Sequence, residues 1–349
     1  MGRLLLRHFG QTLLGIWLLA SAVFLLSRAG SEQALRQVLP TTTDLLAPTT
    51  TAAGLRATRA VTRHRLGLDR PLFYIGRTAT GGWQWRGWHN QYHQWLRALG
   101  HGSLGTSFRT GEPVTQRLAR ALAFTLPLTA TAAGLAALAA LALALRLAAA
   151  PRWQPPVRTA LVALQSLPLF VVALALLLLL ANPDVLDWFP ANGLASISNS
   201  IQLSPTLLLT ALPRLVLPVA ALVLAALPEL TLQLDAALAH ELQQPYILTA
   251  KAKGLRTSAV VRRHALRNAL LPTLAQLAEL LPAMVAGAVV VEVIFALPGM
   301  GRLLAEAAAT RDYPVLVGGV LLVGTARLVS LLLADLSYSW ADPRIRWQA

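Results

Sequence analysis

The sequence predicts an all-α integral membrane protein with six transmembrane helices and one large segment outside the membrane after the first helix. Three observations support this class. Of the 349 residues, 55% are hydrophobic and only 13% are charged, which is about half the charged share of a soluble domain. Apolar runs long enough to cross a bilayer recur along the chain, and the cations gather in alternate loops. These figures exclude a soluble globular or a disordered protein.

Six apolar segments reach roughly the 20 residues that a helix needs to cross the hydrocarbon core. Each contains few ionisable side chains, because charges inside a membrane are costly. The predicted spans are Phe9–Leu26, Leu122–Leu145, Leu161–Ala181, Leu215–Leu234, Leu274–Leu297 and Val315–Leu336.

The distribution of cations orients these spans. With the N-terminus inside, the segments on that side carry thirteen Lys and Arg, whereas the two short outer loops carry only Arg214, Arg302 and Arg311. The positive-inside rule therefore places both termini in the cytoplasm. The N-terminus also resembles a secretory signal, but its small residues Ala20–Ala22 lie inside the apolar run, which favours an uncleaved first span.

Residues 29–118 form the large outer segment. Its eleven Arg do not contradict the topology, because long loops cross the membrane largely regardless of charge. His89 and His93 have the spacing of a metal-ligand pair on a helix, but no carboxylate lies near them, so ordinary surface histidines are favoured. The segment holds four tryptophans, which fit a small core or an interfacial aromatic belt better than a ligand-binding site: Trp83, Trp85, Trp88 and Trp95.

Several chemistries have no support in the sequence. The net charge of +15 belongs to a chain too apolar for a nucleic-acid-binding module, and there is no cysteine. Gly100–Gly105 matches G-x-G-x-x-G, but a helical pattern precedes it and a loop follows it, unlike the strand–turn–helix of a dinucleotide site. No P-loop, zinc-protease or serine-hydrolase motif occurs. We therefore expect no catalytic residue, metal or bound cofactor in this chain.

The loop of residues 240–273 carries the clearest local pattern. Pro245 can begin a short helix, and Gly254 can end it, with Lys251 and Lys253 in the last turn where cations favour the helix dipole. Thr257 or Ser258 can cap a second helix.

The second helix is basic on one face and apolar on another. The basic face carries Arg256, Arg263 and Arg267. The apolar face carries Leu266 and Leu270, which lie four residues apart. Such a helix pair suits either a surface of anionic lipid or a groove in a partner protein. The pattern alone leaves both open.

This loop resembles the cytoplasmic coupling loop, or EAA loop, of permease subunits in binding-protein-dependent ABC importers. The resemblance rests on AKAKGL at 250–255 and RHALRNALLP at 263–272, and the dipeptide/oligopeptide/nickel permease family fits best. Two departures are Leu248-Thr249 in place of the broad motif's Glu-Ala, and Ser103 in place of an acid. Further family-like motifs occur in the same order: LGLDRP at 66–71, GSLGTS at 102–107, GEPV at 111–114, EVIFALPGMGR at 292–302, RDYP at 311–314 and DPRIR at 342–346.

The resemblance implies the type I ABC importer (MetI-like) fold, with the large segment in the periplasm and the chain in a bacterial inner membrane. It implies a second homologous permease, two cytoplasmic subunits that bind ATP and Mg, and a periplasmic or lipid-anchored substrate-binding protein. Membrane lipid is a further expected partner, and no contact with nucleic acid is expected. The implied divisions are an N-terminal span at 1–28, a periplasmic segment at 29–118, a permease domain at 119–336 with the coupling loop at 240–273, and a cytoplasmic tail at 337–349.

Two sets of site residues follow from the resemblance. The ATPase-coupling set comprises Ala250, Lys251, Ala252, Lys253, Gly254, Leu255, Arg263, His264, Arg267, Asn268 and Pro272. The intramembrane or gate candidates are Glu292, Pro298, Gly299, Gly301, Arg302 and Arg327.

Ionisable side chains inside the membrane form a separate question. Arg327 is the deepest in its span and should pair with Glu292 or Glu279, since an unpaired charge is costly there. A structural ion pair is favoured over contact with substrate.

The implied function is a permease subunit that forms the path for peptides in an ATP-driven importer, without enzymatic activity of its own. Importers of antimicrobial peptides or nickel are alternatives within the same type. An ion-coupled secondary transporter is a more remote alternative, and scattered acids and histidines disfavour a membrane enzyme.

Overall fold

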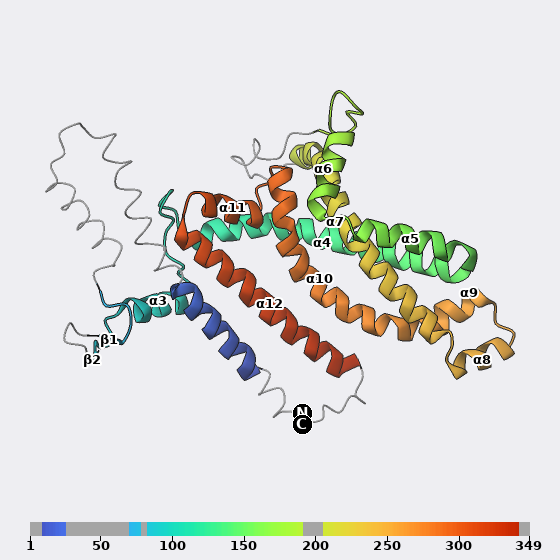
Figure 1. Ribbon diagram of the computed structural model, residues 1–349, viewed down its shortest axis with the longest axis horizontal. Helices are drawn as coiled ribbons and strands as arrows, with labels where there is room; N and C mark the ends of the chain where they lie inside the picture. Colours follow the sequence, from blue (N-terminus) through green and yellow to red (C-terminus); the bar gives the residue numbers. More distant parts are fainter. Residues whose placement is uncertain (1–8, 26–69, 78–81, 191–204, 342–349) are drawn as a thin grey trace. The chain divides into compact units, whose positions relative to one another are not determined.

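The computed structural model describes residues 9–25, 70–77, 82–190 and 205–341 (Figure 1). Within these residues the chain is mostly helical, as the sequence predicts. The all-α class needs one correction, because two strands, β1 (Ile75–Arg77) and β2 (Trp83–Trp85), form an antiparallel pair. Aromatic and β-branched side chains at these positions favour strands.

The helices follow one another with short connections. After an unlabelled helix at Phe9–Leu25, they are α3 (Gln91–Gly100), α4 (Val114–Ala149), the 3₁₀ turn η1 (Pro151–Trp153), α5 (Gln154–Gln165), α6 (Leu169–Leu180), α7 (Pro205–Glu241), α8 (Pro245–Ala252), α9 (Thr257–Val260), the π-helix η3 (Val261–Ala265), α10 (Leu266–Ile294), α11 (Met300–Ala309) and α12 (Tyr313–Ala341).

The chain divides into two compact units. The larger unit comprises Met1–Leu13, Arg120–Ala305 and Val323–Ala349, and the smaller comprises Leu14–Ala119 and Glu306–Leu322. Each unit contains segments that are distant in the sequence, so contacts between different helices hold each unit together.

In the larger unit, a row of alanines on α4 packs along α7. The row recurs every four residues, so its members share one face of the helix. Ala136 and Ala140 share a core cluster with Ala226 and Leu230 of α7. Towards the end of α4, Ala144 clusters with Leu234. A further cluster joins α4 and α7 to α6 and α10.

Three helices among the described residues are long and apolar enough to cross a membrane: Val114–Ala149, Leu212–Glu241 and Tyr313–Leu332. A fourth crossing results if α5 and α6 together make one span. These helices support a multi-pass membrane protein. The count of six spans stays a prediction.

The predicted span at 161–181 is not one straight helix. It is divided between α5 and α6, which are bent by 97° at the intervening break. Pro168 stands at the break with extended backbone angles of φ −60° and ψ 142°. Proline has no amide hydrogen and disfavours helical geometry in the residue before it, so it separates two runs that are both apolar enough to be helical.

The smaller unit is built around the end of the first helix. Ala20 and Val23 share a cluster with Leu321 of α12, and Trp95 of α3 packs against it. Gly318 permits a close approach, because a Cβ there would lie 2.8 Å from the Val114 side chain. The start of α12 and the start of α4 therefore meet at a position that only glycine accommodates without a shift.

Candidate functional site

The coupling loop, residues 240–273, begins with the short helix that the sequence predicts. Helix α8 begins at Pro245 and ends at Ala252, and Gly254 follows with φ +75°. No atom lies within 4 Å of the position where a Gly254 Cβ would stand. The backbone angle therefore requires glycine here, rather than a shortage of space.

The second half of the loop differs from the prediction of a separate short helix. Helix α9 continues through the π-helix η3 directly into α10, and Pro272 lies inside α10 rather than at its beginning. The run from Ala265 to Leu271 contains strong helix formers and no residue that breaks a helix. A proline inside a membrane-associated helix is tolerated where neighbouring groups satisfy the freed carbonyl.

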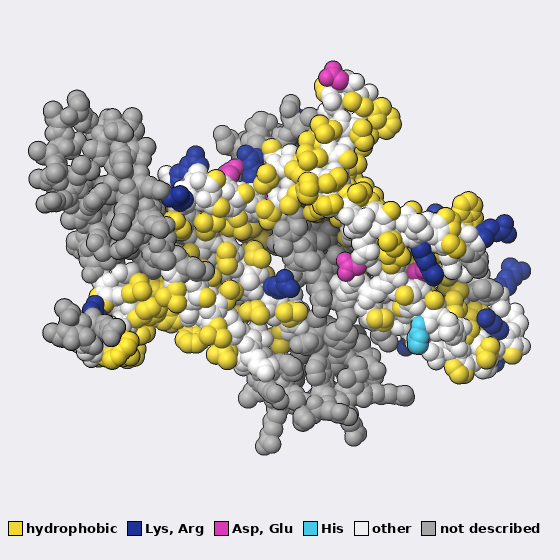
Figure 2. All heavy atoms as spheres, viewed as in Figure 1, with side chains coloured by type: hydrophobic (Ala, Val, Ile, Leu, Met, Phe, Trp, Pro, Cys, Tyr) yellow, Lys and Arg dark blue, Asp and Glu magenta, His cyan; other side chains and the backbone are white. Residues whose placement is uncertain are grey.

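The loop has a buried apolar face and an exposed basic face. Ile247, Val260 and Ala265 are buried in one cluster with Leu234 and Leu238 of α7. The cations lie on the opposite side, and Figure 2 shows them gathered over the α8 and α9 end of the larger unit. The exposed ones are Lys251, Lys253, Arg256, Arg262, Arg263 and Arg267.

The remaining coupling candidates divide between the two faces. Ala250 is buried, Leu255 and His264 are half-buried, and Ala252, Gly254, Asn268 and Pro272 are exposed. The predicted set thus extends from α8 through α9 and η3 into the beginning of α10, and Ala250 and Leu255 pack in the cluster that includes Leu234 and Leu238 of α7.

A polar brace fixes the geometry of this loop. The Tyr246 hydroxyl donates to Glu241 Oε2, and Asn268 Nδ2 donates to the Tyr246 hydroxyl oxygen over 3.1 Å and to Glu241 Oε2 over 3.4 Å. Burial, and then the bond to Glu241, raise the pKa of Tyr246, so the phenol stays a donor. The brace joins the end of α7, the start of α8 and α10. Nothing in the sequence pattern indicated Glu241 or Tyr246.

Glu292 caps a helix within the larger unit. Its fully buried carboxyl accepts from the Thr125 hydroxyl over 2.6 Å and from the backbone amides of Gly301 and Arg302 over 2.6 and 3.2 Å. Thr125 Oγ1 also accepts from the Met300 amide over 2.8 Å. The first amides of α11, which have no partner within the helix, are thereby satisfied.

The glycines of the same motif make room for this cap. A Cβ at Gly299 would lie 2.1 Å from the Glu292 carboxyl, and one at Gly301 would lie 2.2 Å from the Val289 Cα. Half-buried Pro298 stands in the connecting turn, and the Arg302 guanidinium donates to the Ala296 carbonyl over 2.8 Å. Five of the six gate candidates therefore form one helix cap.

The sixth gate candidate, Arg327, is an exposed residue of α12. The expected pairing of Arg327 with Glu292 is not found among the described side chains, because the Glu292 carboxyl is occupied by Thr125 and the two amides. The side chain of Glu279 lies outside the described residues. Thr125 was missed because a threonine in an apolar run carries no signal of a partner 167 positions away.

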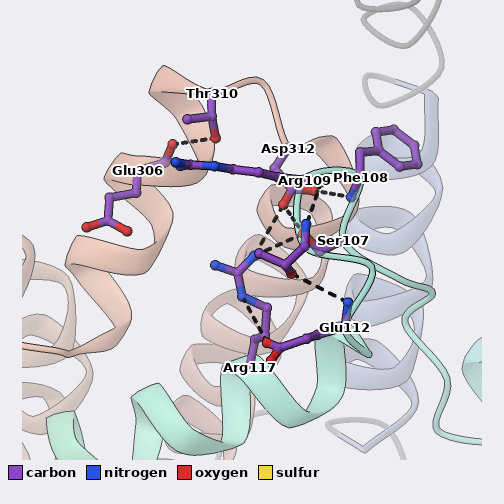
Figure 3. A network of polar contacts seen from close by, with 9 residues as sticks. Ser107, Phe108, Arg109, Glu112, Arg117, Glu306, Thr310 and Asp312 are labelled. Carbon is purple, nitrogen blue, oxygen red and sulfur yellow. Dashed lines mark hydrogen bonds and ion pairs between the residues drawn. The ribbon is translucent and has the colours of Figure 1, made fainter. Parts of the chain in front are cut away.

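A second polar network lies in the smaller unit (Figure 3). Asp312, at the start of α12, is 2% exposed. Its carboxylate accepts from the Ser107 hydroxyl, from the Phe108 amide over 3.0 Å and from Arg117 Nη1 over 3.3 Å. We call this network the Asp312 clamp, because it fastens the loop before α4 to the start of α12.

The clamp unites two of the family-like motifs of the sequence. Ser107 ends GSLGTS and Asp312 lies in RDYP, 205 positions apart. Arg117, in the first turn of α4, donates to Ser107 Oγ over 3.0 Å and lies 3.9 Å from a Glu112 carboxylate oxygen. Polar residues at the ends of apolar runs make each motif visible in the sequence. A single sequence does not indicate that the two motifs meet.

Comparison with known proteins now identifies the class. Residues 132–347 match the family described as the binding-protein-dependent transport system inner membrane component. This match covers well over half of the chain, so the protein belongs to that family of transport permeases.

The relatives narrow the class to ABC importer permeases for dipeptides and oligopeptides. The chain is 35% identical over 301 residues to the di/tripeptide transport system permease protein DppB of Pseudomonas aeruginosa (strain UCBPP-PA14), covering 82% of this chain and 84% of that protein. It is 32% identical over 258 residues to the oligopeptide transport system permease protein AppB of Bacillus subtilis (strain 168), covering 74% and 80%. A crystal structure of an amino acid ABC transporter with histidines aligns with a TM-score of 0.46 at 18% identity, over 65% of this chain and 94% of that chain. A likeness at that level carries no conclusion.

Proposed function

We propose that this chain is one of two homologous permease subunits that together form the path for short peptides in an ATP-driven importer. The coupling loop is the observation that carries the proposal, because it packs its apolar face on the spans and presents its cations outward. The relatives that transport di/tripeptides and oligopeptides support the substrate class.

The proposal assigns the other functions to partners. Two cytoplasmic subunits bind ATP and Mg, and a periplasmic or lipid-anchored substrate-binding protein delivers the peptide. The chain itself catalyses no reaction and holds no cofactor. In this proposal both termini and the coupling loop lie in the cytoplasm, and the excess of Lys and Arg in these segments supports that orientation.

The geometry suggests how the loop transmits motion. Helix α8 contacts the spans through Ile247 and Ala250, which are buried in the cluster that includes Leu234 and Ala269. Since α9 runs into α10 without a break, a displacement of residues 257–265 moves the beginning of α10 with it. The closure of an ATPase dimer against α8 and α9 would thus reach both α7 and α10.

Co-purification tests the assembly. We expect the tagged chain, expressed with its neighbouring genes, to retain two ATP-binding subunits and a second permease. Proteoliposomes of that complex should take up radiolabelled dialanine only with the binding protein and ATP, and vanadate should block the uptake. Uptake driven by an ion gradient without ATPase subunits would contradict the proposal and favour a secondary transporter. ATP-driven uptake of nickel in place of the peptide would limit the error to the substrate.

Gly254 gives the sharper test of coupling. In Gly254→Val, a β-branched residue must adopt φ +75°, which costs about 1–2 kcal/mol and corresponds to roughly a tenfold effect on the population of this turn. We expect peptide uptake to fall at least about tenfold while the protein still inserts. Gly254→Asn is the matched control, since asparagine tolerates this region and no neighbouring atom obstructs a side chain. Equal uptake by the two variants would overturn this role.

A further inference from the structure

A continuous series of aromatic rings leads away from the end of the first apolar helix. Phe24, one residue before that helix ends, is fully buried. Its ring centroid lies 5.2 Å from those of Tyr92 and Trp95. Tyr92 in turn lies 6.2 Å from Tyr74. The Ser21 hydroxyl and the Tyr92 hydroxyl, 2.7 Å apart, add a polar link between the helix and α3.

The series ends in exposed tryptophans. Tyr74 stacks on Trp85 at 5.7 Å and meets Trp88 edge-on at 5.8 Å, yet Trp85 and Trp88 are 61% and 64% exposed. Trp83 is 78% exposed. Trp83 and Trp85 share one face of β2 because strand side chains alternate, and Ile75 is directly opposite Trp85 in the strand pair. The two interpretations of the tryptophans therefore apply to different residues: Trp95 belongs to a core, and the other three form a surface.

We name Tyr74, Ile75, Trp83, Trp85 and Trp88 the aromatic hairpin. Figure 2 shows apolar side chains over β1, β2 and α3. The sequence around them is purely cationic, because residues 70–111 contain five Arg and no Asp or Glu. Arg70, Arg86 and Arg97 are exposed. The surface thus combines large amphipathic rings with positive charge.

We propose that the aromatic hairpin rests on the membrane, with its rings in the interfacial layer of the leaflet from which the first span emerges. Three observations favour lipid as the occupant. The ring series begins at the end of the apolar helix Phe9–Leu25, which the sequence predicts to be the first span. Tryptophan and tyrosine favour the membrane–water interface. Exposed arginines attract anionic headgroups, and residues 70–111 supply five Arg and no Asp or Glu. This inference does not depend on which substrate the importer carries.

The anchor gives the otherwise unexplained segment before α4 a mechanical role. The hairpin, α3 and the end of the first helix are held by the same aromatic contacts, so seating the hairpin in the interface fixes the height of that helix end. The experiment needs the full-length chain in a bilayer, and lipid-borne quenchers report directly on the tryptophans.

The full-length protein in nanodiscs of phosphatidylcholine and phosphatidylglycerol is titrated with brominated phosphatidylcholine, and tryptophan fluorescence is recorded. The variant Trp83→Phe/Trp85→Phe/Trp88→Phe is compared with wild type, and the difference isolates the hairpin. We expect bromines near the headgroup to quench this difference signal at least about twice as strongly as bromines near the bilayer centre, as interfacial rings require. Trp95→Phe is the matched control and should not remove the shallow quenching.

Two results would overturn the proposal. One is a difference signal that bromines at neither depth quench, which would mean that the hairpin rings do not touch lipid. The other is hairpin fluorescence that aqueous acrylamide quenches freely until purified substrate-binding protein is added, which would mean that the hairpin docks a protein. Because phenylalanine preserves an aromatic ring at exposed positions, the variant is expected to fold, and near-ultraviolet circular dichroism of the remaining tryptophans checks this.

Discussion

Glu292, in the last turn of α10, and Asp312, just before α12, are both buried acids, yet the chain satisfies them in opposite ways. Glu292 is fully buried and accepts only from a hydroxyl and two backbone amides. No Lys, Arg or His among the described residues lies within ion-pair distance of it. Asp312 is 2% exposed and has Arg117 as a cationic partner at 3.3 Å. One site is built from dipoles and the other from charges.

The difference follows from where each acid gets its donors. Glu292 reaches nine positions along the chain to the free amides at the start of α11, and aligned amides favour a negative group there. Asp312 occupies the cap position of α12, since its carbonyl accepts from the Leu316 amide. Its carboxylate is directed instead to Ser107, Phe108 and Arg117. The amide donors to Glu292 are therefore local, although its hydroxyl donor Thr125 comes from α4. The side-chain and amide donors to the Asp312 carboxylate all lie 195 to 205 positions away.

The largest expected effect concerns the space beside the Glu292 cap. In Gly301→Ala, the new Cβ would lie 2.2 Å from the Val289 Cα, and a backbone atom cannot move aside as a side chain can. We expect the unfolding free energy, measured by SDS titration in mixed micelles, to fall by about 3 kcal/mol or more. Gly134→Ala is the matched control, because nothing lies within 4 Å of its Cβ position and alanine favours helix. Equal losses in the two variants would contradict the close packing.

The close packing at Gly301 could not be predicted from the sequence, whereas the local features of the fold could. The low charged fraction and the length of the apolar runs predicted a helical membrane protein, and Pro245 and Gly254 predicted the limits of α8 because caps are local. The bend at Pro168 was not predicted, because the segments on both sides of it are apolar and together look like one span. The partnership of Ser107 with Asp312 and of Thr125 with Glu292 escaped for a deeper reason. Neither spacing nor composition specifies which polar residues of distant helices meet.

The next effect tests the charge at the clamp. Asp312→Asn removes the nearer and more buried of the two carboxylates beside Arg117. We expect a loss of about 2 kcal/mol, below the 3–5 kcal/mol of a fully buried pair, since the Arg117 side chain is 18% exposed and Glu112 stays 3.9 Å away. Glu292→Gln should cost only about 1 kcal/mol, because no cation is left unpaired. Both losses come from the same SDS titration.

A double-mutant cycle separates the pair from the rest of the clamp. Asp312→Asn combined with Arg117→Met should cost less than the sum of the single changes by about 1 kcal/mol, as expected for interacting neighbours. Strictly additive losses would mean that Arg117 stabilises the chain independently of Asp312. A larger loss for Glu292→Gln than for Asp312→Asn would reverse the contrast between the two acids.

The smallest effect isolates the hydroxyl that completes the Glu292 cap. Thr125→Val keeps the shape of the side chain but removes the donor to Glu292 and the acceptor for the Met300 amide, and we expect a loss of about 1–2 kcal/mol. Thr125→Ser loses a buried methyl group instead, worth roughly 0.8 kcal/mol, so stability alone hardly distinguishes the variants. Hydrogen exchange of the peptide containing Met300, Gly301 and Arg302 does, because only the valine variant releases an amide from its acceptor. Faster exchange in Thr125→Val than in Thr125→Ser is expected, and equal rates would mean that the Thr125 hydroxyl does not protect the Met300 amide.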